Sequence, residues 1–223
     1  MKIEIIEVSK VIHKNKVLDQ INYTMQSGKI YGIQGINGSG KTMLMRTIIG
    51  LIHPTTGRIL IDGREIGKEL EFPESIGFLL ENPAFLDRYS GYQNLEMLAS
   101  IKEKISSEEI KKALMRVGLD EEAAKKKYRK YSLGMKQRLG IAAAIMENPE
   151  LLILDEPTNA LDTEGVNLVK DIIRKEKNRG ALVVLSCHDF KVLEELSDEI
   201  IKLENGRIIK GVSGGKKGEA DDR

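Results

Sequence analysis

A glycine-rich run offers the clearest chemistry in the chain: Gly35-Ile36-Asn37-Gly38-Ser39-Gly40-Lys41-Thr42. The run follows a short apolar stretch and opens a helical pattern, which is the setting that a phosphate-binding loop requires. Glycines let backbone N–H groups turn toward phosphate oxygens, and a helix that begins near Lys41 directs its positive dipole end to the same point. We expect these residues to bind a nucleoside triphosphate, with Lys41 at the β- and γ-phosphates and the Thr42 hydroxyl on a Mg²⁺. The alternative is a glycine-rich turn that matches the pattern by chance.

Two adjacent carboxylates, Asp155 and Glu156, follow the apolar run at 151–154. Such a run is typical of a parallel strand that is covered on both faces, and ligands of open α/β sheets gather at the carboxyl ends of these strands. We expect Asp155 to orient the ligands of the Mg²⁺ and Glu156 to polarise an attacking water, which phosphoryl transfer requires. The alternative is a pair of acids that cap a loop.

Charge and composition exclude several classes of protein. The chain has 223 residues, with 35 Lys and Arg against 34 Asp and Glu, so its net charge is +1. No basic surplus argues for a nucleic acid or an anionic membrane surface as the partner. No apolar stretch approaches the ~18–20 residues that span a bilayer, and the first residues lack the layout of a secretory signal, so we expect a chain that is soluble on its own. A single cysteine, Cys187, excludes an internal disulfide.

Alternation and apolar runs predict the elements that must position these residues. We expect strands at 3–8, 21–25, 30–34, 76–80, 151–154 and 181–185, and hairpins around Asp62-Gly63 and Asn205-Gly206. Helical patterns cover 42–51, 91–146 and 166–178, with a helix start at Ser106 or Ser107. The chain therefore divides into a core of residues 1–83 plus 149–210, a helical lobe at about 84–148, and a disordered tail at 211–223.

Three further segments accompany the phosphate loop and the acidic strand end. They are Tyr131-Ser132-Leu133-Gly134-Met135, Asn159-Ala160-Leu161-Asp162 and Ser186-Cys187-His188. In this order the five motifs resemble those of an ATP-binding cassette (ABC) ATPase over nearly the whole chain. The resemblance implies an α/β fold of the P-loop NTPase class, with a mainly parallel sheet, an N-terminal antiparallel β region and a helical lobe. It also implies ATP and Mg²⁺ as cofactors.

The resemblance implies a role for residues in each of these three segments. Ser132 and Gly134, the signature residues, would reach the γ-phosphate of the ATP that a second subunit holds. Asp162 would join the two ATP sites across the dimer, and His188 would contact the γ-phosphate and help to hold the catalytic geometry. Each role has a plainer alternative, because Ser132 and Asp162 would also serve as helix N-caps and a lone histidine is usually structural.

Two positions depart from the usual pattern of the family. Glu81 stands where most ABC ATPases carry Gln, and in this respect the segment resembles the cassettes of bacterial peptide-antibiotic exporters, of the lantibiotic-immunity and bacitracin-resistance type. Glu81 would then share the Mg²⁺ or order the attacking water, unless it is a surface residue in a turn. Ile12 and His13 stand where the family usually places an aromatic residue against adenine, so the stacking is either weak or falls to His13.

The main hypothesis is the ATP-hydrolysing subunit of an ABC transporter, cytoplasmic and peripherally attached to the inner face of the cell membrane. Two such subunits, identical or different, would clamp ATP and drive a separate transmembrane permease that docks near residues 84–98, and the cargo would be a peptide antibiotic or another hydrophobic compound. The alternative is a soluble ABC ATPase that acts on ribosomes or DNA, although those proteins typically carry two cassettes or long coiled coils. A small-molecule kinase is disfavoured, since it needs no Ser132–Gly134 segment together with a His188 switch.

Overall fold

The computed structural model describes residues 1–102 and 104–213. The β-strands are β1 (Lys2–Ile12), β2 (Asn15–Gln26), β3 (Ile30–Gln34), β4 (Thr56–Ile61), β5 (Arg64–Glu65), β6 (Ile76–Leu79), β7 (Leu151–Leu154), β8 (Leu182–Ser186), β9 (Glu199–Glu204) and β10 (Arg207–Ser213). The helices are α1 (Lys41–Ile48), α2 (Gly91–Lys102), α3 (Ser107–Arg116), α4 (Glu121–Lys125), α5 (Leu133–Ile145), α6 (Thr163–Asn178) and α7 (Phe190–Leu196), together with a 3₁₀ turn η1 (Tyr128–Lys130). The predicted strands at 30–34 and 151–154 are confirmed residue for residue.

The strands form two sheets. One is a four-stranded antiparallel sheet in the order β2-β1-β4-β5, and the other is a six-stranded sheet in the order β10-β9-β3-β8-β7-β6. In the six-stranded sheet only β10 runs antiparallel to its neighbour, so the other five strands all end at the same edge. Every residue of β7 and β8 is buried, as expected of parallel strands that are covered on both faces. The predicted fold class is therefore confirmed.

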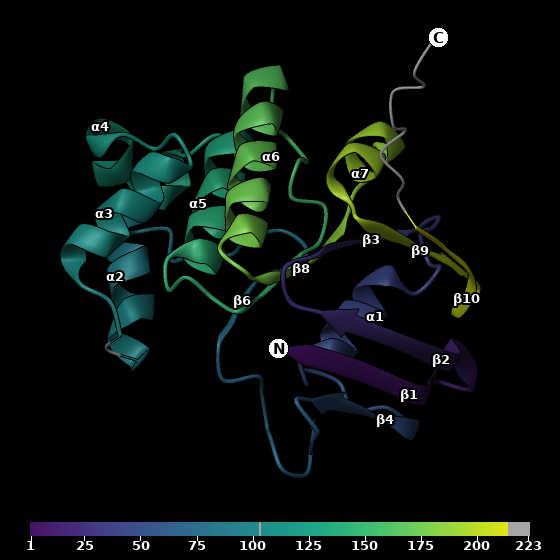
Figure 1. Ribbon diagram of the computed structural model, residues 1–223. Helices are drawn as coiled ribbons and strands as arrows, with labels where there is room; N and C mark the ends of the chain where they lie inside the picture. The colour runs from purple at the N-terminus through teal and green to yellow at the C-terminus, as the bar shows by residue number, and fades with distance from the viewer. Residues whose placement is uncertain (103, 214–223) are drawn as a thin grey trace, which may run out of the picture.

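The central sheet separates two apolar cores. On one face, α1 lies between the two sheets (Figure 1), and its Leu44 and Ile48 pack with buried residues of β1 and β2 such as Ile3 and Leu18. On the other face, α5, α6 and α7 cover the sheet and share the second core with it. Helix α1 ends at Ile48, two residues before Gly50 adopts a left-handed φ of 84°, which stops the helix short of the predicted end at 51.

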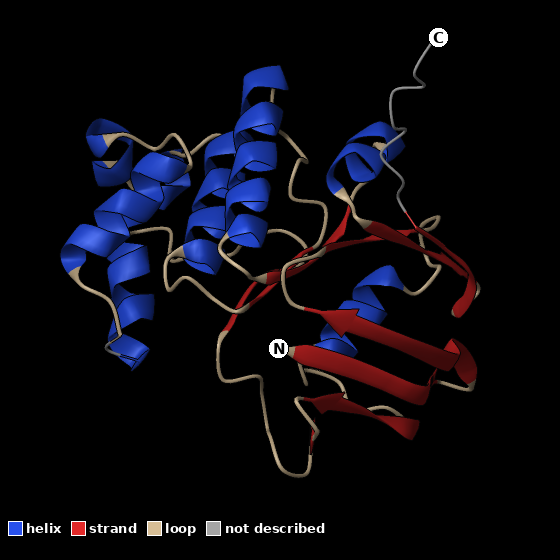
Figure 2. Cartoon of the chain, in the orientation of Figure 1, coloured by secondary structure: helices blue, strands red, loops and turns tan. Residues whose placement is uncertain are grey.

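The helical region lies on one side of the molecule (Figure 2) and contains α2, α3, α4 and α5. The predicted start of α3 is confirmed, because the Ser106 side chain accepts from the Glu109 N–H and the Glu109 carboxylate accepts from the Ser106 N–H in a capping box. The region is not a separate core, however. Helix α5 packs directly on β6, where a Cβ on Gly77 would lie 1.7 Å from the Ala144 carbonyl oxygen. This helix links the helical region to the sheet.

Two expectations about the C-terminal third need correction or stay open. Strand β10 runs to Ser213, so it extends past the predicted start of the tail at 211, and residues 214–223 lie outside the described part of the chain. Helix α7 was not predicted.

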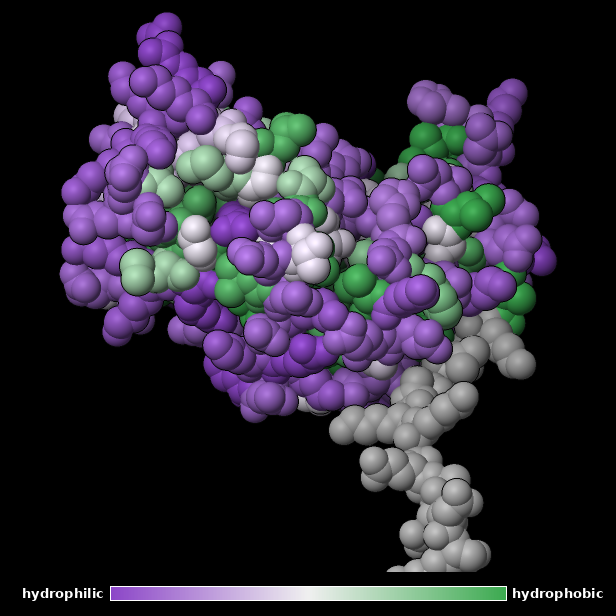
Figure 3. All heavy atoms as spheres, turned by 90° about the horizontal axis from the view of Figure 1, so that it is seen from above, coloured by the Kyte–Doolittle hydropathy of each residue, from purple (hydrophilic) through white to green (hydrophobic). Residues whose placement is uncertain are grey.

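Across residues 1–102 and 104–213, none of the helices combines the length and the apolar character needed to cross a membrane. Seen from above, the surface is mostly hydrophilic, with small hydrophobic groups between polar residues (Figure 3).

Candidate active site

The predicted site residues meet at the carboxyl edge of the parallel strands. Strand register places Ile33 of β3 beside Ser186 of β8, and Leu154 of β7 beside Leu185. The phosphate loop leaves β3, and the carboxylates Asp155 and Glu156 leave β7, so these segments emerge on either side of the end of β8. The sheet order thus brings together the phosphate loop, residues 155–156 and Ser186, although the loop precedes the other two by more than a hundred residues in the sequence.

The phosphate loop spans residues 35–40 between β3 and α1. Gly38 and Gly40 have φ values of 80° and 109°, which residues with a Cβ rarely adopt. The Lys41 ammonium bends back over the loop and donates to the carbonyl oxygens of Gly35 at 2.8 Å and Ile36 at 3.3 Å. The loop therefore carries a buried cation at its centre and the N-terminus of α1 at its end, which together favour an anion.

One polar atom of the phosphate loop indicates whether the loop suits a phosphate group. Within the described residues, the Ser39 Oγ is buried and has no hydrogen-bond partner, although buried hydroxyls are nearly always satisfied. A Cβ on Gly35 would lie only 2.3 Å from that oxygen, so the glycine keeps the space beside Ser39 open. The glycines, the Lys41 cation and this hydroxyl fit the triphosphate of a nucleotide.

Asp155 is the most heavily bonded carboxylate of the edge. One of its oxygens accepts from the Thr42 hydroxyl at 2.5 Å, and the other accepts from the Ser186 hydroxyl at 2.5 Å. Its own N–H donates to the Leu79 carbonyl of β6 at 2.7 Å, and the residue is buried. A carboxylate oxygen and a hydroxyl oxygen are the kinds of ligand that Mg²⁺ prefers, so the paired Asp155 and Thr42 fit the predicted metal position.

Glu156 occupies a strained backbone position that its neighbours hold from both sides. Its φ is 53°, a region that costs a residue with a side chain on the order of 1–3 kcal/mol. The Glu156 N–H donates to the Ser186 Oγ at 3.1 Å, and its carbonyl accepts from the Gln137 Nε2 at 3.0 Å. Strain of this kind persists where the surroundings enforce it, and it concentrates at functional sites. The Glu156 backbone is thereby fixed at the carboxyl edge of the sheet, directly after Asp155.

His188 contacts the carboxylate of Glu156. The backbone N–H of His188 donates to one carboxylate oxygen at 2.7 Å, and the His188 Nε2 lies 3.7 Å from the other. The histidine side chain is 59% exposed, whereas that of Glu156 is 15% exposed. The imidazole is therefore available to a ligand while the carboxylate is partly enclosed. Beside it, burial raises the pKa of the Cys187 thiol, whose sulfur lies 3.2 Å from the Thr158 hydroxyl.

Glu81 lies at the same edge but has a different partner. Its carboxylate accepts from the Arg46 guanidinium at 2.7 Å, and its side chain is 61% exposed. Arg46 stands one turn after Thr42 on α1, so this ion pair links the segment after β6 to the helix that follows the phosphate loop. Participation of Glu81 in binding Mg²⁺ stays a prediction.

The signature residues and the Asp162 loop lie against each other within the chain. Ser132 caps α5, with its Oγ accepting from the Met135 N–H at 3.2 Å, and Asp162 caps α6, accepting from the Gly165 N–H at 2.8 Å. A Cβ on Gly134 would lie 3.0 Å from the Ala160 carbonyl oxygen. Ser132 and Asp162 thus both serve as helix N-caps, which was the plainer alternative for each. A contact of either residue with a second subunit would be an additional role.

The end of the site predicted to hold the base is a tight turn. His13 and Lys14, with φ values of 45° and 67°, connect β1 to β2, and Ile12 ends β1 half-buried while His13 is exposed. No aromatic ring comes from these three positions other than the His13 imidazole. Which of Ile12 and His13 contacts adenine stays open.

Comparison with known proteins decides the family. A family model described as ABC transporter matches residues 18–159. The chain belongs to the ABC transporter family, as an ATP-binding subunit. It is 46% identical over 206 residues to the ABC transporter ATP-binding protein YybJ of Bacillus subtilis, covering 92% of this chain and 94% of that protein.

Two further ABC relatives carry names that state a cargo. The bacitracin transport ATP-binding protein BcrA of Enterococcus faecalis is 38% identical over 95% of this chain and 69% of its own length. The lantibiotic transport ATP-binding protein SrtF of Streptococcus pyogenes is 35% identical over 93% of this chain and 89% of its own length. The predicted resemblance to ABC proteins of the bacitracin and lantibiotic type is confirmed.

Solved structures confirm the ABC fold. A structure titled as the ATP-binding subunit of an ABC transporter superposes with a TM-score of 0.85 at 26% identity, covering 96% of this chain and 90% of that one. The dimeric structure of MJ0796, a bacterial ABC transporter cassette, superposes with a TM-score of 0.87 at 24% identity, covering 96% and 99%. The second likeness concerns the fold alone.

The sequence missed two residues of this ABC cassette site. Ser186 bonds both Asp155 and the Glu156 N–H, and Gln137 bonds the Glu156 carbonyl. Ser186 follows the predicted strand at 181–185, so the rule that parallel strands share one carboxyl edge could have placed it beside Asp155. Gln137 gave no such signal, because its contact depends on how α5 packs against the sheet.

Proposed function

We propose that this chain is the ATP-hydrolysing subunit of an ABC transporter, that two such subunits clamp ATP between them, and that they power a separate permease from the cytoplasmic face of the membrane. The observation that carries the proposal is the connected set Thr42, Asp155, Ser186, Glu156 and His188 beside the phosphate loop. The set supplies a metal position, a carboxylate for the attacking water and a ligand-accessible imidazole at one edge.

Binding would begin at the phosphate loop. The N–H groups of residues 35–40, the N-terminus of α1 and the Lys41 ammonium would receive the β- and γ-phosphates. Thr42 and Asp155 would hold the Mg²⁺, which supplies charge neutralisation for the phosphate oxygens when it is bound. Ser186 keeps the Asp155 carboxylate in place on the side opposite to Thr42.

Hydrolysis would depend on Glu156. Its carboxylate would orient a water molecule and take the proton as the water oxygen bonds to the γ-phosphorus and the bond to the ADP oxygen breaks. His188 would steady the carboxylate through its backbone N–H and contact the γ-phosphate with its exposed imidazole. Glu81 would add a carboxylate near α1. This carboxylate would interact with the metal once its ion pair with Arg46 is broken.

The signature surface would complete the site of the second subunit. Ser132 and Gly134 lie at the exposed N-terminus of α5, where the next residue, Leu133, is 73% exposed. The Ser132 hydroxyl and the helix N-terminus would meet the γ-phosphate held by the partner, and Asp162 would contact the partner nearby. Membership of the ABC transporter family supports this arrangement.

A groove on the helical side would receive the permease. It has a volume of about 380 Å³ and is lined by β6, the segment after it, the end of α2 and the second half of α5. Phe78, Leu98 and Ile101 line it and are 46%, 38% and 76% exposed, so they would bury apolar surface against a permease helix. Phe85, within the docking segment expected from the sequence, also lines this groove and packs edge-on against Tyr128, with ring centroids 5.4 Å apart.

The cargo would be a peptide antibiotic or another hydrophobic compound. The names of BcrA and SrtF support this class, and Glu81 was the residue that suggested it from the sequence. Cells that lose the chain would then become more sensitive to bacitracin or to a lantibiotic, and plasmid-borne wild-type chain would restore growth. Unchanged growth inhibition by both compounds would contradict a peptide-antibiotic cargo and leave another hydrophobic compound as the proposal.

The partner can be identified by capture of tagged Glu156→Gln chain from its own cells, with ATP and mild detergent, followed by mass spectrometry. We expect a multi-span membrane protein that, once purified, stimulates ATP turnover by the wild-type chain. Ile101→Asp should abolish that stimulation, whereas Met115→Asp, on an exposed apolar residue of α3 outside the groove, should preserve it. Ribosomal proteins or DNA factors as the captured partners would instead favour a soluble ABC ATPase.

A further inference from the structure

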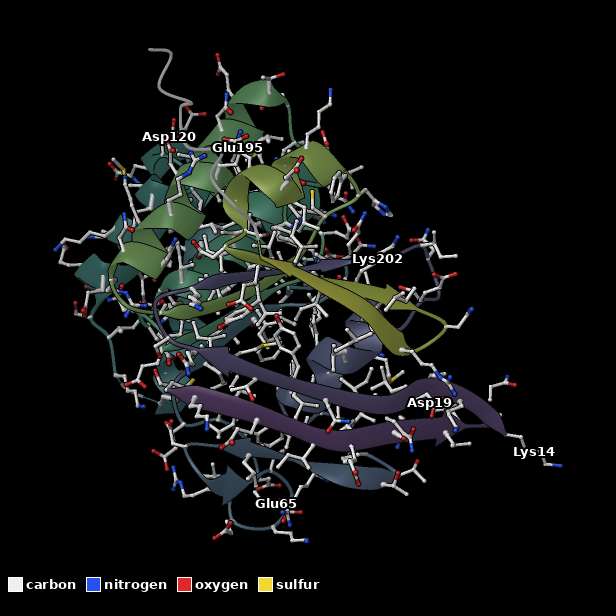
Figure 4. The ribbon with its side chains drawn as sticks, turned by 45° about the vertical axis from the view of Figure 1, so that its right-hand side comes forward. Lys14, Asp19, Glu65, Asp120, Glu195 and Lys202 are labelled. Atoms are coloured by element: carbon white, nitrogen blue, oxygen red, sulfur yellow. The ribbon has the colours of Figure 1, made fainter. Side chains whose placement is uncertain are left out.

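A charged contact on the outer side of the phosphate loop joins the hairpin whose turn is predicted to hold the base to a second hairpin near the C-terminus. Asp19 of β2 is 7% exposed, and its carboxylate accepts from the Lys16 Nζ at 2.8 Å and from the Arg207 Nε at 2.6 Å. Arg207 is the first residue of β10, so the contact ties the β1–β2 hairpin to the β9–β10 hairpin. Figure 4 shows Asp19 on the hairpin that Lys14 ends, facing the β9–β10 hairpin.

Backbone hydrogen bonds continue this contact to the phosphate loop. The Asp19 N–H donates to the Gly206 carbonyl at 2.8 Å, and the Gly206 N–H donates to the Ser39 carbonyl at 3.0 Å. Gly206 precedes Arg207 directly, so the ion pair fixes the peptide that holds Ser39. Asp19, Gly206 and Ser39 therefore form one chain of bonds from the hairpins to the loop.

The glycines along this series of hydrogen bonds have no space beside them for a side chain. A Cβ on Gly206 would lie 2.6 Å from the Val17 carbonyl oxygen, and a Cβ on Gly40 would lie 2.9 Å from the same oxygen. A Cβ on Gly35 would lie 2.6 Å from the Leu203 carbonyl oxygen of β9. The outer side of the phosphate loop thus rests on backbone of both hairpins, and a shift of either hairpin would move the loop.

We propose that Asp19 and Arg207 are positioning residues that hold the phosphate loop in its anion-binding shape through Gly206 and Ser39. Several N–H groups must converge on each phosphate, and a loop that is already ordered loses less entropy when the nucleotide binds. The two residues would act through the loop backbone, without contacting the nucleotide. The inference rests on the proposed function, since it assigns them to the ATP site.

Substitution of Arg207 separates positioning from chemistry. Arg207→Ala should raise the KM for ATP and the Kd for ADP about tenfold while kcat changes less than about threefold, because Glu156 and His188 stay in place. Arg207→Lys should restore most of the affinity. The matched control is Arg64→Ala, which removes an exposed arginine paired with Glu74 at the far edge of the four-stranded sheet and should leave both constants unchanged.

Asp19→Asn gives a second test of the same contact. If the pair acts as a unit, Asp19→Asn combined with Arg207→Ala should weaken ADP binding little more than either change alone. Thermal unfolding of each variant checks that the chain is folded. Unchanged nucleotide constants in folded Arg207→Ala, or a loss confined to kcat, would overturn the inference.

The outcomes also separate this inference from the proposed function. Wild-type chain that hydrolyses ATP normally, together with an unaffected Arg207→Ala, would overturn the positioning role alone. Wild-type chain that binds ADP without hydrolysing ATP, with ADP binding weakened by Arg207→Ala, would contradict the proposed ATPase and support the positioning role. Wild-type chain that binds neither nucleotide would overturn both.

Discussion

Ser186 shows how one hydroxyl can serve two residues of a site. It donates to the Asp155 carboxylate at 2.5 Å and accepts from the Glu156 N–H at 3.1 Å, in a fully buried position. Both proposed functional carboxylates therefore depend on a residue that makes no predicted contact with the nucleotide.

We predict that Ser186→Ala lowers ATP turnover at least about tenfold and lowers the free energy of unfolding by about 1–3 kcal/mol, because it leaves the Glu156 N–H unsatisfied. Urea denaturation and steady-state turnover measure the two effects. Ser100→Ala removes an exposed hydroxyl that bonds the Met97 carbonyl and should change neither quantity appreciably. Full turnover in Ser186→Ala would show that Asp155 and Glu156 need no such support.

The sequence predicted those residues of the site whose roles are local. The phosphate loop and the Asp155–Glu156 pair follow strands directly, so a motif and its preceding apolar run were sufficient to place them. Ser186 and Gln137 depend on strand register and on helix packing, which no short motif encodes. The distance of His188 from Glu156 likewise became known only from the fold.

Among the elements, the two hairpins beside the phosphate loop are joined by charge. The Lys16 hydrogen bond and then the Arg207 guanidinium lower the pKa of Asp19 from its ordinary value of 3.8. A carboxylate with a lowered pKa adds stability that is present above the unfolded pKa and is lost as the pH falls through the folded pKa. The contact should therefore persist at neutral pH and fail in acid.

We predict that Asp19→Asn is less stable than the wild-type chain at pH 7, and that the difference shrinks as the pH falls below about 4. Urea denaturation at a series of pH values measures the difference, and Arg64→Ala serves as the pH-insensitive control, since its Glu74 partner is exposed. An equal loss of stability at pH 7 and in acid would show that the Asp19 charge contributes nothing.

Element boundaries were predicted where caps or buried runs mark them. The Asn205-Gly206 turn and the Ser106 cap carried clear signals, and both are confirmed. Helix α7 was missed because it has only seven residues, too few for a convincing period, although Asp189 caps it and Leu193 and Leu196 repeat on its buried side. The sequence could not show that α5, within the predicted helical lobe, packs on β6, because that contact depends on the fold.

For the whole molecule, the proposed function requires a second copy or a related subunit. The signature residues face outward at the N-terminus of α5, and the phosphate loop tip at Ile36 is 77% exposed. A dimer would cover both surfaces. The dimeric state stays a proposal that light scattering can test.

We predict that Glu156→Gln with ATP forms a particle of twice the monomer mass in light scattering, and that adding Ser132→Ala weakens this dimer at least about tenfold. Ser132 also caps a helix, which is worth about 1 kcal/mol of stability. Ser106→Ala, which removes the equivalent cap from α3, controls for that loss and should leave the dimer intact. Equal dimer affinity in both variants would contradict the signature role.

The central claim is that this chain hydrolyses ATP with Glu156, and the most direct test is the steady-state turnover of Glu156→Gln measured beside its ATP affinity. We predict a loss of turnover of at least about 100-fold with an ATP Kd within a few-fold of wild type, because the amide cannot take a proton from water. Glu194→Gln, on an exposed glutamate of α7, should behave as wild type. Undiminished turnover in Glu156→Gln would contradict the account.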